Sequence, residues 1–236
     1  MLDITALNYT YPGETETAMH FDLSVAAGEV LALIGPSGAG KSTLLNLIAG
    51  FLSAQSGQIS IEGERVETLA VSRRPVSMVF QQNNLFPHLD LYTNVGLGIN
   101  PSMQLNERQQ DAVSDAFERL GLGGLERRKP GEVSGGQRQR VALARVLVRE
   151  RKVLLLDEAF AALGPAQRAE MIELVATLVR EKGIAALLVS HQPGDARIAS
   201  ARTAFVAAGK IVEISNTEEL LDRPGLPEIR DYLGSI

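Results

Sequence analysis

The chain has 236 residues, 45% of them hydrophobic, which is enough to bury one substantial core together with a smaller subdomain. It contains no cysteine, which excludes disulfides and cysteine-based metal or redox chemistry, and its net charge of −5 argues against a bulk basic surface for nucleic acid. No apolar run approaches the roughly 18 residues that cross a bilayer, and residues 1–5 lack the basic start of a signal peptide. We therefore expect a cytoplasmic chain that only another protein could hold at a membrane.

Strand patterns fill the start of the chain and lead into a glycine-rich loop. Phe21, Leu23 and Val25 alternate with polar residues, as in a half-buried strand, and Val30–Ile34 is a continuous apolar run that suits a strand covered on both faces. A helix is expected after the loop, with its end near Gly50. Its apolar positions, spaced i, i+3, i+4 and i+7, are Leu44, Leu47, Ile48 and Phe51.

The loop between this strand and this helix is a P-loop. Its glycines let backbone N–H groups converge on phosphate oxygens at the positive end of the helix, while Lys41 supplies charge to the outer phosphates and Ser42 a hydroxyl to Mg²⁺. A glycine loop that fits the pattern by chance is the alternative, but a true nucleotide site requires this placement between a strand and a helix. The residues of the motif are Gly35, Pro36, Ser37, Gly38, Ala39, Gly40, Lys41, Ser42 and Thr43.

The middle of the chain is predominantly helical. The pattern predicts a polar helix over Asn106–Leu120, a glycine-rich break, and another helix over Gln137–Arg149. We interpret residues 87–151 as a helical subdomain inserted into an α/β core made of residues 1–86 and 152–236. The expected fold class is therefore α/β, with a P-loop NTPase core, an N-terminal antiparallel β subdomain and an inserted α-helical subdomain.

A second glycine motif opens the later helix. Ser134 suits an N-cap, and Gly135 and Gly136, followed by Gln137, leave backbone amides open to an anion. By itself, a capped helix start is the simpler interpretation. The basic residues here are expected on a solvated face and not on a nucleic-acid surface, because the helix is amphipathic and the protein acidic. They are Arg138, Arg140, Arg145, Arg149 and Arg151.

Three later apolar strands, over residues 76–80, 153–156 and 184–190, each end in polar side chains. Parallel strands joined by helices place ligands at their carboxyl ends, so we expect these side chains beside the P-loop. They are Gln81, Asp157 with Glu158, and His191.

Each of these side chains suits one task on a nucleoside triphosphate. Asp157 can orient Mg²⁺ through water, and Glu158 can position or polarise the attacking water. His191 can donate to a γ-phosphate oxygen, and Gln81 can bind Mg²⁺ or water weakly without a change of charge. Taken singly, each could instead be a solvated strand end or a structural residue, but together with a P-loop the functional interpretation is favoured.

The order and spacing of these motifs resemble the ATPase subunits of ABC transporters over nearly the whole chain. That resemblance implies a head-to-tail homodimer with two ATPs at its interface, in which the P-loop of one copy faces the motif at residues 134–137 of the other. Ser134, Gly136 and Gln137 would then act on the γ-phosphate of the opposite copy.

The same resemblance implies a complete set of cofactors and site residues. The cofactors are ATP and Mg²⁺, and Tyr11 is expected to stack on adenine. The implied catalytic residues are Lys41, Gln81, Glu158 as the base, and His191, with Gln81 and His191 as switches, and the implied Mg²⁺ ligands are Ser42, Gln81 and Asp157.

A narrower resemblance is to the ATPases of thiamine importers in Gram-negative bacteria. It rests on residues 72–86 and 94–101 and on the short C-terminal part, because related ATPases for maltose, sulfate or polyamines usually carry a further regulatory domain. It implies a subunit at the cytoplasmic face of the inner membrane, with a periplasmic protein delivering thiamine or its phosphates. A permease would dock near Gln82–Leu89, where Leu85 and Phe86 could fit a groove. An importer of a metal ion, an anion or a polyamine is the alternative.

The chain departs from the family pattern in one loop. After Glu158 the family reads Pro-Phe-x-Ala-Leu-Asp, whereas residues 159–164 here read Ala-Phe-Ala-Ala-Leu-Gly. In the family the aspartate contacts the opposite P-loop, and Gly164 has no side chain to make that contact. We hypothesise that communication between the two sites, or the rate of hydrolysis, is reduced.

Two other classes of P-loop protein are alternatives. DNA-repair and chromosome ABC ATPases carry long coiled-coil or zinc insertions between the motifs, and this cysteine-free sequence has neither. A P-loop kinase acting on a small molecule leaves the motif at residues 134–137 unexplained. A transport ATPase that works as a dimer accounts for both glycine motifs.

Overall fold

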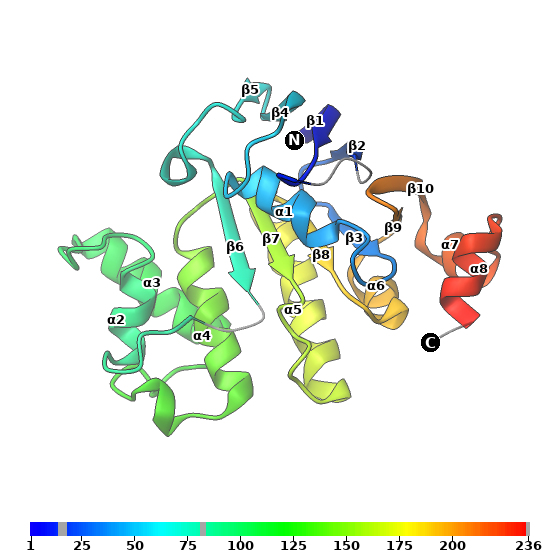
Figure 1. Ribbon diagram of the computed structural model, residues 1–236. Coiled ribbons are helices and arrows are strands. Elements are labelled where there is room, and N and C mark those ends of the chain that lie inside the picture. Colours follow the sequence, from blue (N-terminus) through cyan, green and yellow to red (C-terminus); the bar gives the residue numbers. More distant parts are fainter. Residues whose placement is uncertain (14–17, 81–83, 235–236) are drawn as a thin grey trace.

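The computed structural model describes residues 1–13, 18–80 and 84–234, in which ten strands form one mixed sheet (Figure 1). Gln81 and residues 82 and 83 of the expected docking segment lie outside the described residues. Across the sheet the strands are β5 (Glu64–Arg65), β4 (Ser56–Ile61), β1 (Leu2–Tyr9), β2 (Met19–Val25), β10 (Lys210–Asn216), β9 (Arg202–Ala207), β3 (Val30–Ile34), β8 (Ala185–Val189), β7 (Val153–Asp157) and β6 (Val76–Phe80).

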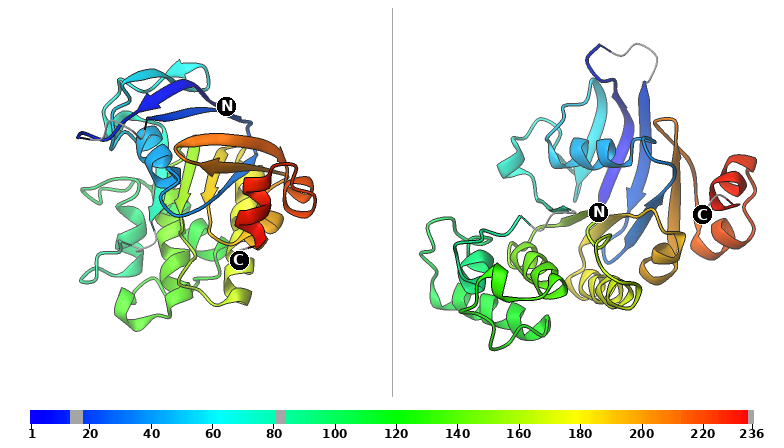
Figure 2. Two further views of the ribbon diagram at one scale, coloured as in Figure 1. Left: turned by 45° about the vertical axis from the view of Figure 1, so that its right-hand side comes forward. Right: turned by 60° about the horizontal axis from the view of Figure 1, so that its bottom comes forward.

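Helices cover both faces of the parallel part of the sheet, and three of them, α2, α3 and α4, gather beside β6 (Figures 1 and 2). Within the described residues no helix is long and apolar enough to cross a membrane. The helices are α1 (Lys41–Ala49), α2 (Leu91–Gly96), α3 (Glu107–Arg119), α4 (Gly135–Leu147), α5 (Pro165–Lys182), α6 (Pro193–Ala199), α7 (Thr217–Asp222) and α8 (Pro227–Gly234), with 3-10 turns at Val71–Arg73 and Pro130–Glu132.

The strands from the start of the chain form an antiparallel region, as the sequence predicts. β1 pairs antiparallel with both β2 and β4, and β4 pairs in the same sense with β5. In β2 the side chains of Phe21, Leu23 and Val25 are buried while the residues between them are exposed. The alternation in the sequence therefore reports a strand with one covered face.

The parallel part of the sheet carries the motifs. β3 lies between β9 and β8, and β7 and β6 follow beyond β8, all five strands running parallel. Their carboxyl ends meet at one edge, where Ile34 leads into the P-loop, Asp157 ends β7, and Val189 precedes the turn that carries His191. The pairing confirms the expectation that these motifs share one edge of the sheet.

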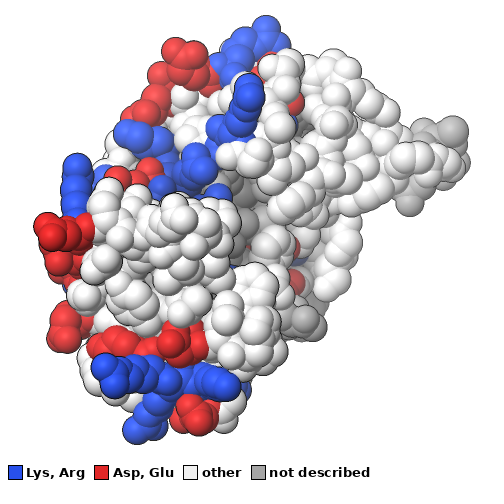
Figure 3. All heavy atoms as spheres, turned by 90° about the vertical axis from the view of Figure 1, so that its left-hand side faces the viewer, with Lys and Arg blue, Asp and Glu red and all other residues white. Residues whose placement is uncertain are grey.

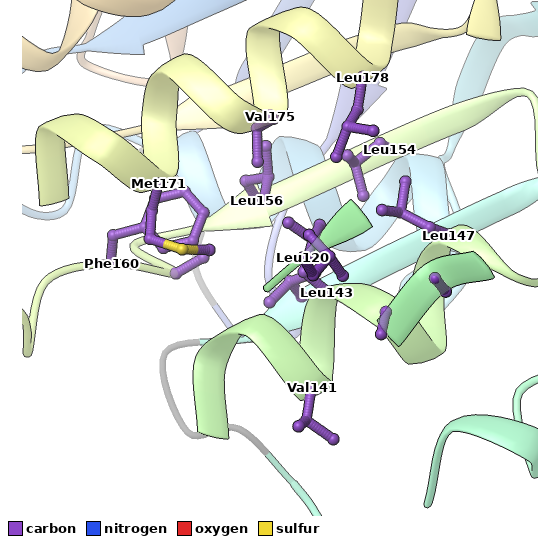
Figure 4. Packing of buried hydrophobic residues seen from close by; sticks show 14 of the residues in the cluster. Leu120, Val141, Leu143, Leu147, Leu154, Leu156, Phe160, Met171, Val175 and Leu178 are labelled. Atoms are coloured by element: carbon purple, nitrogen blue, oxygen red, sulfur yellow. The ribbon is translucent and has the colours of Figure 1, made fainter. Parts of the chain in front are cut away.

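β7 is apolar along its length because both faces of the sheet are covered. Val153 and Leu155 belong to a hydrophobic cluster with α1 and the antiparallel strands. Leu154 and Leu156 belong to a second cluster with α4 and α5, part of which is drawn in Figure 4. A strand between two helical layers needs apolar side chains on both sides, which explains the continuous run in the sequence.

The helical group packs on the core through the same second cluster. Phe117 of α3 and Leu143 of α4 belong to it together with Leu156 of β7 and Met171 of α5. The last three are labelled in Figure 4. α2, α3 and α4 all fall within residues 87–151. The domain boundaries at either end of that range stay predictions.

α1 ends before its apolar spacing predicts. Gly50 adopts a left-handed backbone with φ 88°, and the helix stops there. Phe51 is consequently turned away and 53% exposed, whereas Leu44, Leu47 and Ile48 are buried as expected. The assignment of Phe51 to the buried stripe was therefore wrong, because the helix does not reach it.

A buried arginine holds the carboxyl end of α1. The Arg74 guanidinium donates to the carbonyls of Leu47 (2.6 Å) and Ile48 (2.9 Å), and also to those of Glu67 and Leu69 in the segment before β6. Burial lowers the pKa of Arg74, with the charge of Glu67 opposing that shift. The cation also suits the negative end of a helix, so Arg74 joins α1 to the chain that enters β6.

The arginines of α4 are less solvated than expected. Arg140 forms an ion pair with Glu170 of α5, and Arg145 donates to the carbonyl of Asn84 at 2.8 Å. Of the five arginines named from the sequence only Arg149 is exposed, and the other four are partly buried. Figure 3 shows this side of the molecule with Lys and Arg interspersed among Asp and Glu, which does not make a continuous basic surface.

Replacement of Gly50 by alanine tests the contact with Arg74. A Cβ at Gly50 would lie 2.7 Å from Nε of Arg74, whereas a Cβ at Gly183, the left-handed residue that ends α5, would meet no described atom within 4 Å. We expect Gly183→Ala to lower the free energy of unfolding by about 1–2 kcal/mol for the backbone alone. Gly50→Ala should lower it by about 1–3 kcal/mol more, the usual cost of overpacking. If urea unfolding showed the same loss of unfolding free energy for both variants, Arg74 would have moved aside without cost.

Candidate functional site

The P-loop connects β3 to α1 in a fixed shape. Gly35 has φ 143°, and a Cβ there would lie 2.0 Å from the carbonyl oxygen of Val206 in β9, so only glycine fits. Gly40, with φ 101°, precedes α1, and among the described residues no side chain caps that helix start. The first N–H groups of α1 and the positive end of its dipole are therefore available to an anion.

Lys41 lies at the mouth of this loop. The residue is 5% exposed, and its Nζ donates to the carbonyls of Gly35 (2.6 Å) and Pro36 (2.8 Å). Burial lowers the pKa of Lys41, while the nearby carboxylates of Glu158 and Asp157 raise it. An ammonium has three donors, so two carbonyls leave one for a phosphate oxygen.

Ser42 and Asp157 bring two oxygen atoms together across the sheet edge. The Ser42 hydroxyl donates to Oδ1 of Asp157 at 3.0 Å. Burial is the main cause that raises the pKa of Asp157, and the Ser42 hydrogen bond opposes it. Hydroxyl and carboxylate oxygens are the ligands that Mg²⁺ prefers, and Mg²⁺ takes few of them from protein. The described residues contain no group of three or more His, Asp or Glu that could hold a metal ion.

Glu158 and His191 are in direct contact. Nε2 of His191 lies 2.5 Å from Oε1 of Glu158, and their side chains are 41% and 27% exposed. Glu158 has a left-handed backbone with φ 48°, which is strained for a residue with a side chain. Strain of this kind persists where surrounding structure enforces it and is often found at functional sites. Here the Glu158 N–H donates to the carbonyl of Val189 at 3.2 Å, which joins β7 to the end of β8.

Tyr11 reaches the first turn of α1. Its hydroxyl and that of Thr43 lie 2.9 Å apart, and its ring meets Tyr9 edge-on. The structure thus places Tyr11 beside the P-loop, although its expected stacking on adenine stays a prediction. Gln81, expected to be a switch, lies outside the described residues.

The second glycine motif forms a closed cap at the start of α4. The Ser134 hydroxyl accepts from the N–H of Gln137 (3.2 Å), and Oε1 of Gln137 accepts from the N–H of Ser134 (2.9 Å). This is a capping box, as the simpler interpretation held. In Figures 1 and 2 α4 starts within the helical group, apart from the start of α1, so one chain does not bring its two glycine motifs together.

Tyr232, which was not predicted as a site residue, lies beside His191. The Tyr232 hydroxyl of α8 donates to the carbonyl of His191 at 3.5 Å, and its ring packs on Phe205, with centroids 5.4 Å apart. Burial raises the pKa of Tyr232, and a backbone hydrogen bond with Gly35 lowers it. No sequence motif marks this residue, because its position depends on how α8 folds back on the sheet.

Gly164 lies where the family has aspartate, directly before α5. Its backbone, with φ −64° and ψ 158°, is extended and suits any residue, and a Cβ there would meet no described atom within 4 Å. Within the described chain, nothing therefore requires glycine at this position.

The arrangement defines a nucleotide-hydrolysing P-loop protein. An anion site at the start of α1 adjoins a lysine, two oxygen ligands for a cation, and a carboxylate that can act on water. A family model described as "ABC transporter" matches residues 18–161. The chain therefore belongs to the ABC transporter family, and it is an ATPase.

Named relatives resemble the chain along almost its whole length. It is 55% identical over 221 residues to the thiamine import ATP-binding protein ThiQ of Brucella abortus, covering 94% of this chain and 92% of that protein. It is 50% identical over 225 residues to the protein of the same name from Shigella flexneri, covering 95% and 96%.

Solved structures confirm the fold. cbiO1 from Clostridium perfringens, part of the ABC transporter complex cbiONQ, superposes with a TM-score of 0.84 at 30% identity, covering 94% of this chain and 90% of that one. An ATP-binding cassette solved as a dimer in a post-hydrolysis state, bound to ADP and phosphate, gives a TM-score of 0.78 at 26% identity, covering 92% and 99%.

Proposed function

We propose that this ATPase energises the uptake of thiamine or its phosphates through a membrane permease. The observation that carries the proposal is the 50–55% identity, over 94–95% of the chain, to proteins named for thiamine import. That identity is well above the 26–30% to the solved neighbours, so it extends beyond the motifs that ABC ATPases share. The chain would sit at the cytoplasmic face of the inner membrane, held there by the permease, with a periplasmic protein delivering the solute.

The P-loop amides and Lys41 are proposed to hold the phosphates of ATP, with Tyr11 on the adenine. Ser42 and Asp157, and Gln81 as a weaker ligand, would hold Mg²⁺, which neutralises charge that develops on the transferred phosphate. The fit rests on the 3.0 Å contact between the Ser42 hydroxyl and Asp157. A cation there also favours the ionised form of a carboxylate whose pKa is raised by burial.

Glu158 is proposed to accept a proton from the attacking water, under the control of His191. The histidine Nε2 lies 2.5 Å from one oxygen of Glu158, which leaves the other oxygen for water. An imidazole N–H can donate to either a carboxylate or a phosphate. A γ-phosphate would therefore compete with Glu158 for His191, and its arrival would release the carboxylate to act as base.

The ATP site is proposed to be completed by a second copy of the chain in a head-to-tail homodimer. Support comes from Gly135 and Gly136, where a Cβ would meet nothing closer than 3.7 Å. Glycine is a poor helix former, so its use in the first turn of α4 points to a need for open backbone amides. Those amides, with Ser134 and Gln137, would face the γ-phosphate of the partner.

The segment before α2 is proposed to receive the permease. Phe86 is 45% exposed, with the guanidinium carbon of Arg145 6.0 Å from its ring centre. The buried amide of Asn94 fixes the backbone around it, accepting from the Phe86 N–H (2.8 Å) and donating to the carbonyls of Phe86 (3.1 Å) and Leu89 (3.3 Å). An exposed aromatic side chain on a rigid backbone suits an anchor in a partner's groove.

Reconstitution with the cognate permease and binding protein tests the proposed solute. We expect the chain to co-purify with the permease, and thiamine to stimulate ATP hydrolysis in membranes, whereas Lys41→Ala should abolish hydrolysis with or without thiamine. Stimulation by a metal ion, an anion or a polyamine in place of thiamine would identify a different importer. Failure to associate with any permease would reject the transport role.

Glu158→Gln tests the proposed base and the dimer together. The amide keeps the shape of the side chain but cannot accept a proton, so we expect ATP binding to persist and turnover to fall by about 100-fold or more, the scale of general base catalysis. In the presence of ATP the variant should then accumulate as a dimer, which light scattering during gel filtration would measure. A variant that stays monomeric with ATP would contradict the shared site.

Gly164→Asp tests the effect of the missing aspartate. The open space at Gly164 accommodates the side chain, and aspartate at an N-cap should raise the stability of the isolated chain by a few tenths of a kcal/mol relative to glycine. We expect hydrolysis by the assembled transporter to rise, because a contact to the opposite P-loop is restored. Gly164→Asn, which also caps the helix but carries no charge, is the matched control. Unchanged hydrolysis in Gly164→Asp would reject the hypothesis.

A further inference from the structure

The loop after Glu158 is held by side chains from two helices. Arg168 of α5 donates to the carbonyls of Phe160 (3.3 Å), Ala161 (2.9 Å) and Leu163 (3.3 Å). Three carbonyls of the loop at residues 159–164 thus share one guanidinium. At the other end Gln139 of α4 donates to the carbonyl of Ala159 at 2.8 Å, so the loop is also tied to the helix that carries the second glycine motif.

The turn that carries His191 is held by a buried carboxylate. The Ser190 hydroxyl donates to Oδ2 of Asp195 at 2.5 Å and accepts from the N–H of Gln192 at 3.0 Å. The Asp195 N–H donates to the carbonyl of Gln192 at 3.0 Å, and Asp195 is 8% exposed. These bonds hold the residues on both sides of His191, and so the backbone from which its imidazole projects.

A cavity of about 140 Å³ separates the loop from the turn. Its lining includes Glu158 and His191 together with Arg168 and Asp195. Burial raises the pKa of Asp195, the Ser190 hydrogen bond lowers it, and the positive charge of Arg168 lowers it further. Arg168 and Asp195 therefore line one cavity with opposite charges, and no ion pair joins them among the described residues.

We propose that Arg168 and Asp195 are positioning residues whose opposite charges hold the loop at residues 159–164 and the turn carrying His191 in one arrangement. That arrangement sets the contact between His191 and Glu158. The inference rests on the proposed roles of those two residues in hydrolysis. The proposed charge pair couples, within one chain, the position of His191 to the loop in which Gly164 replaces aspartate.

Asp195→Asn separates positioning from a purely structural role. The amide oxygen can still accept from Ser190, but the charge that faces Arg168 is lost. Because burial disfavours a carboxylate, the variant should unfold at an unchanged or higher urea concentration. We nevertheless expect kcat for ATP hydrolysis by the full chain to fall about 2- to 30-fold, the range seen for couplings of this kind, with KM for ATP unchanged. An unchanged kcat overturns the proposal.

Variants of Arg168 test whether the effect passes through the charge pair. Arg168→Lys keeps the charge, so Asp195→Asn should still slow hydrolysis in that background. Arg168→Gln removes the charge, and Asp195→Asn should then add little. Equal effects of Asp195→Asn in both backgrounds would contradict the link. Should Arg168→Gln fail to fold, the single Asp195→Asn variant and the lysine background still decide the question.

Two reference variants make failure of this inference distinct from failure of the proposed function. Asp222→Asn removes an exposed carboxylate that pairs with Arg197, and kcat should not change. His191→Ala should slow hydrolysis if the histidine has the proposed role. If His191→Ala has no effect, the proposed role of His191 in hydrolysis fails; if it slows hydrolysis and Asp195→Asn does not, only the connection through Asp195 fails.

Discussion

The site depends on a helix start that the rest of the described chain leaves open to an anion. No described side chain caps α1, and the residue before it, Gly40, is in a left-handed conformation that aims the first amides outward. The loop below packs closely on β9, where a Cβ at Gly35 would lie 2.0 Å from the carbonyl oxygen of Val206. Lys41 is bound to carbonyls of the same loop. The anion site is thus built mainly from backbone groups that pack closely on the sheet.

The parallel strands bring further polar side chains to this helix start. β3, β8 and β7 are neighbours, so the P-loop, His191 and the carboxylates of Asp157 and Glu158 emerge side by side. Two residues are in unfavourable states at this edge. Glu158 has a left-handed backbone, and burial raises the pKa of Asp157. The strained backbone of Glu158 and the burial of Asp157 are each unfavourable without a ligand. Each accompanies a carboxylate that lies beside the open helix start. The second cluster of buried side chains in turn fixes the helical group on the same sheet.

Much of this was predictable from the sequence, for identifiable reasons. Val30–Ile34 and the apolar run into Asp157 have the length and composition of strands covered on both faces, and parallel strands must end at a common edge. Pro165 and Gly183, at the two ends of α5, are residue types that mark a helix start and stop. Features of this kind depend on nearest neighbours in the chain, so periodicity and turn residues reveal them.

The remainder depends on contacts between residues far apart in the chain. Phe51 fits the helical spacing, yet the left-handed Gly50 excludes it from α1. Arg145 fits a solvated face, but it bonds to a carbonyl that lies 61 residues earlier. Arg168 and Asp195 belong to no motif, and only the folded sheet brings them to one cavity.

The capping box at the start of α4 also bears on how two copies could meet. Ser134 and Gln137 are already fixed by each other, and the glycines between them have no side chain to order. Association through this surface would therefore sacrifice almost no rotamer entropy on this side, which is the advantage of preorganisation. Since its donors are backbone amides at the positive end of a helix, the attraction would be short-ranged and directed at a single anion. Recognition of the partner copy would then depend more on the nucleotide bound to that copy than on the shape of its surface.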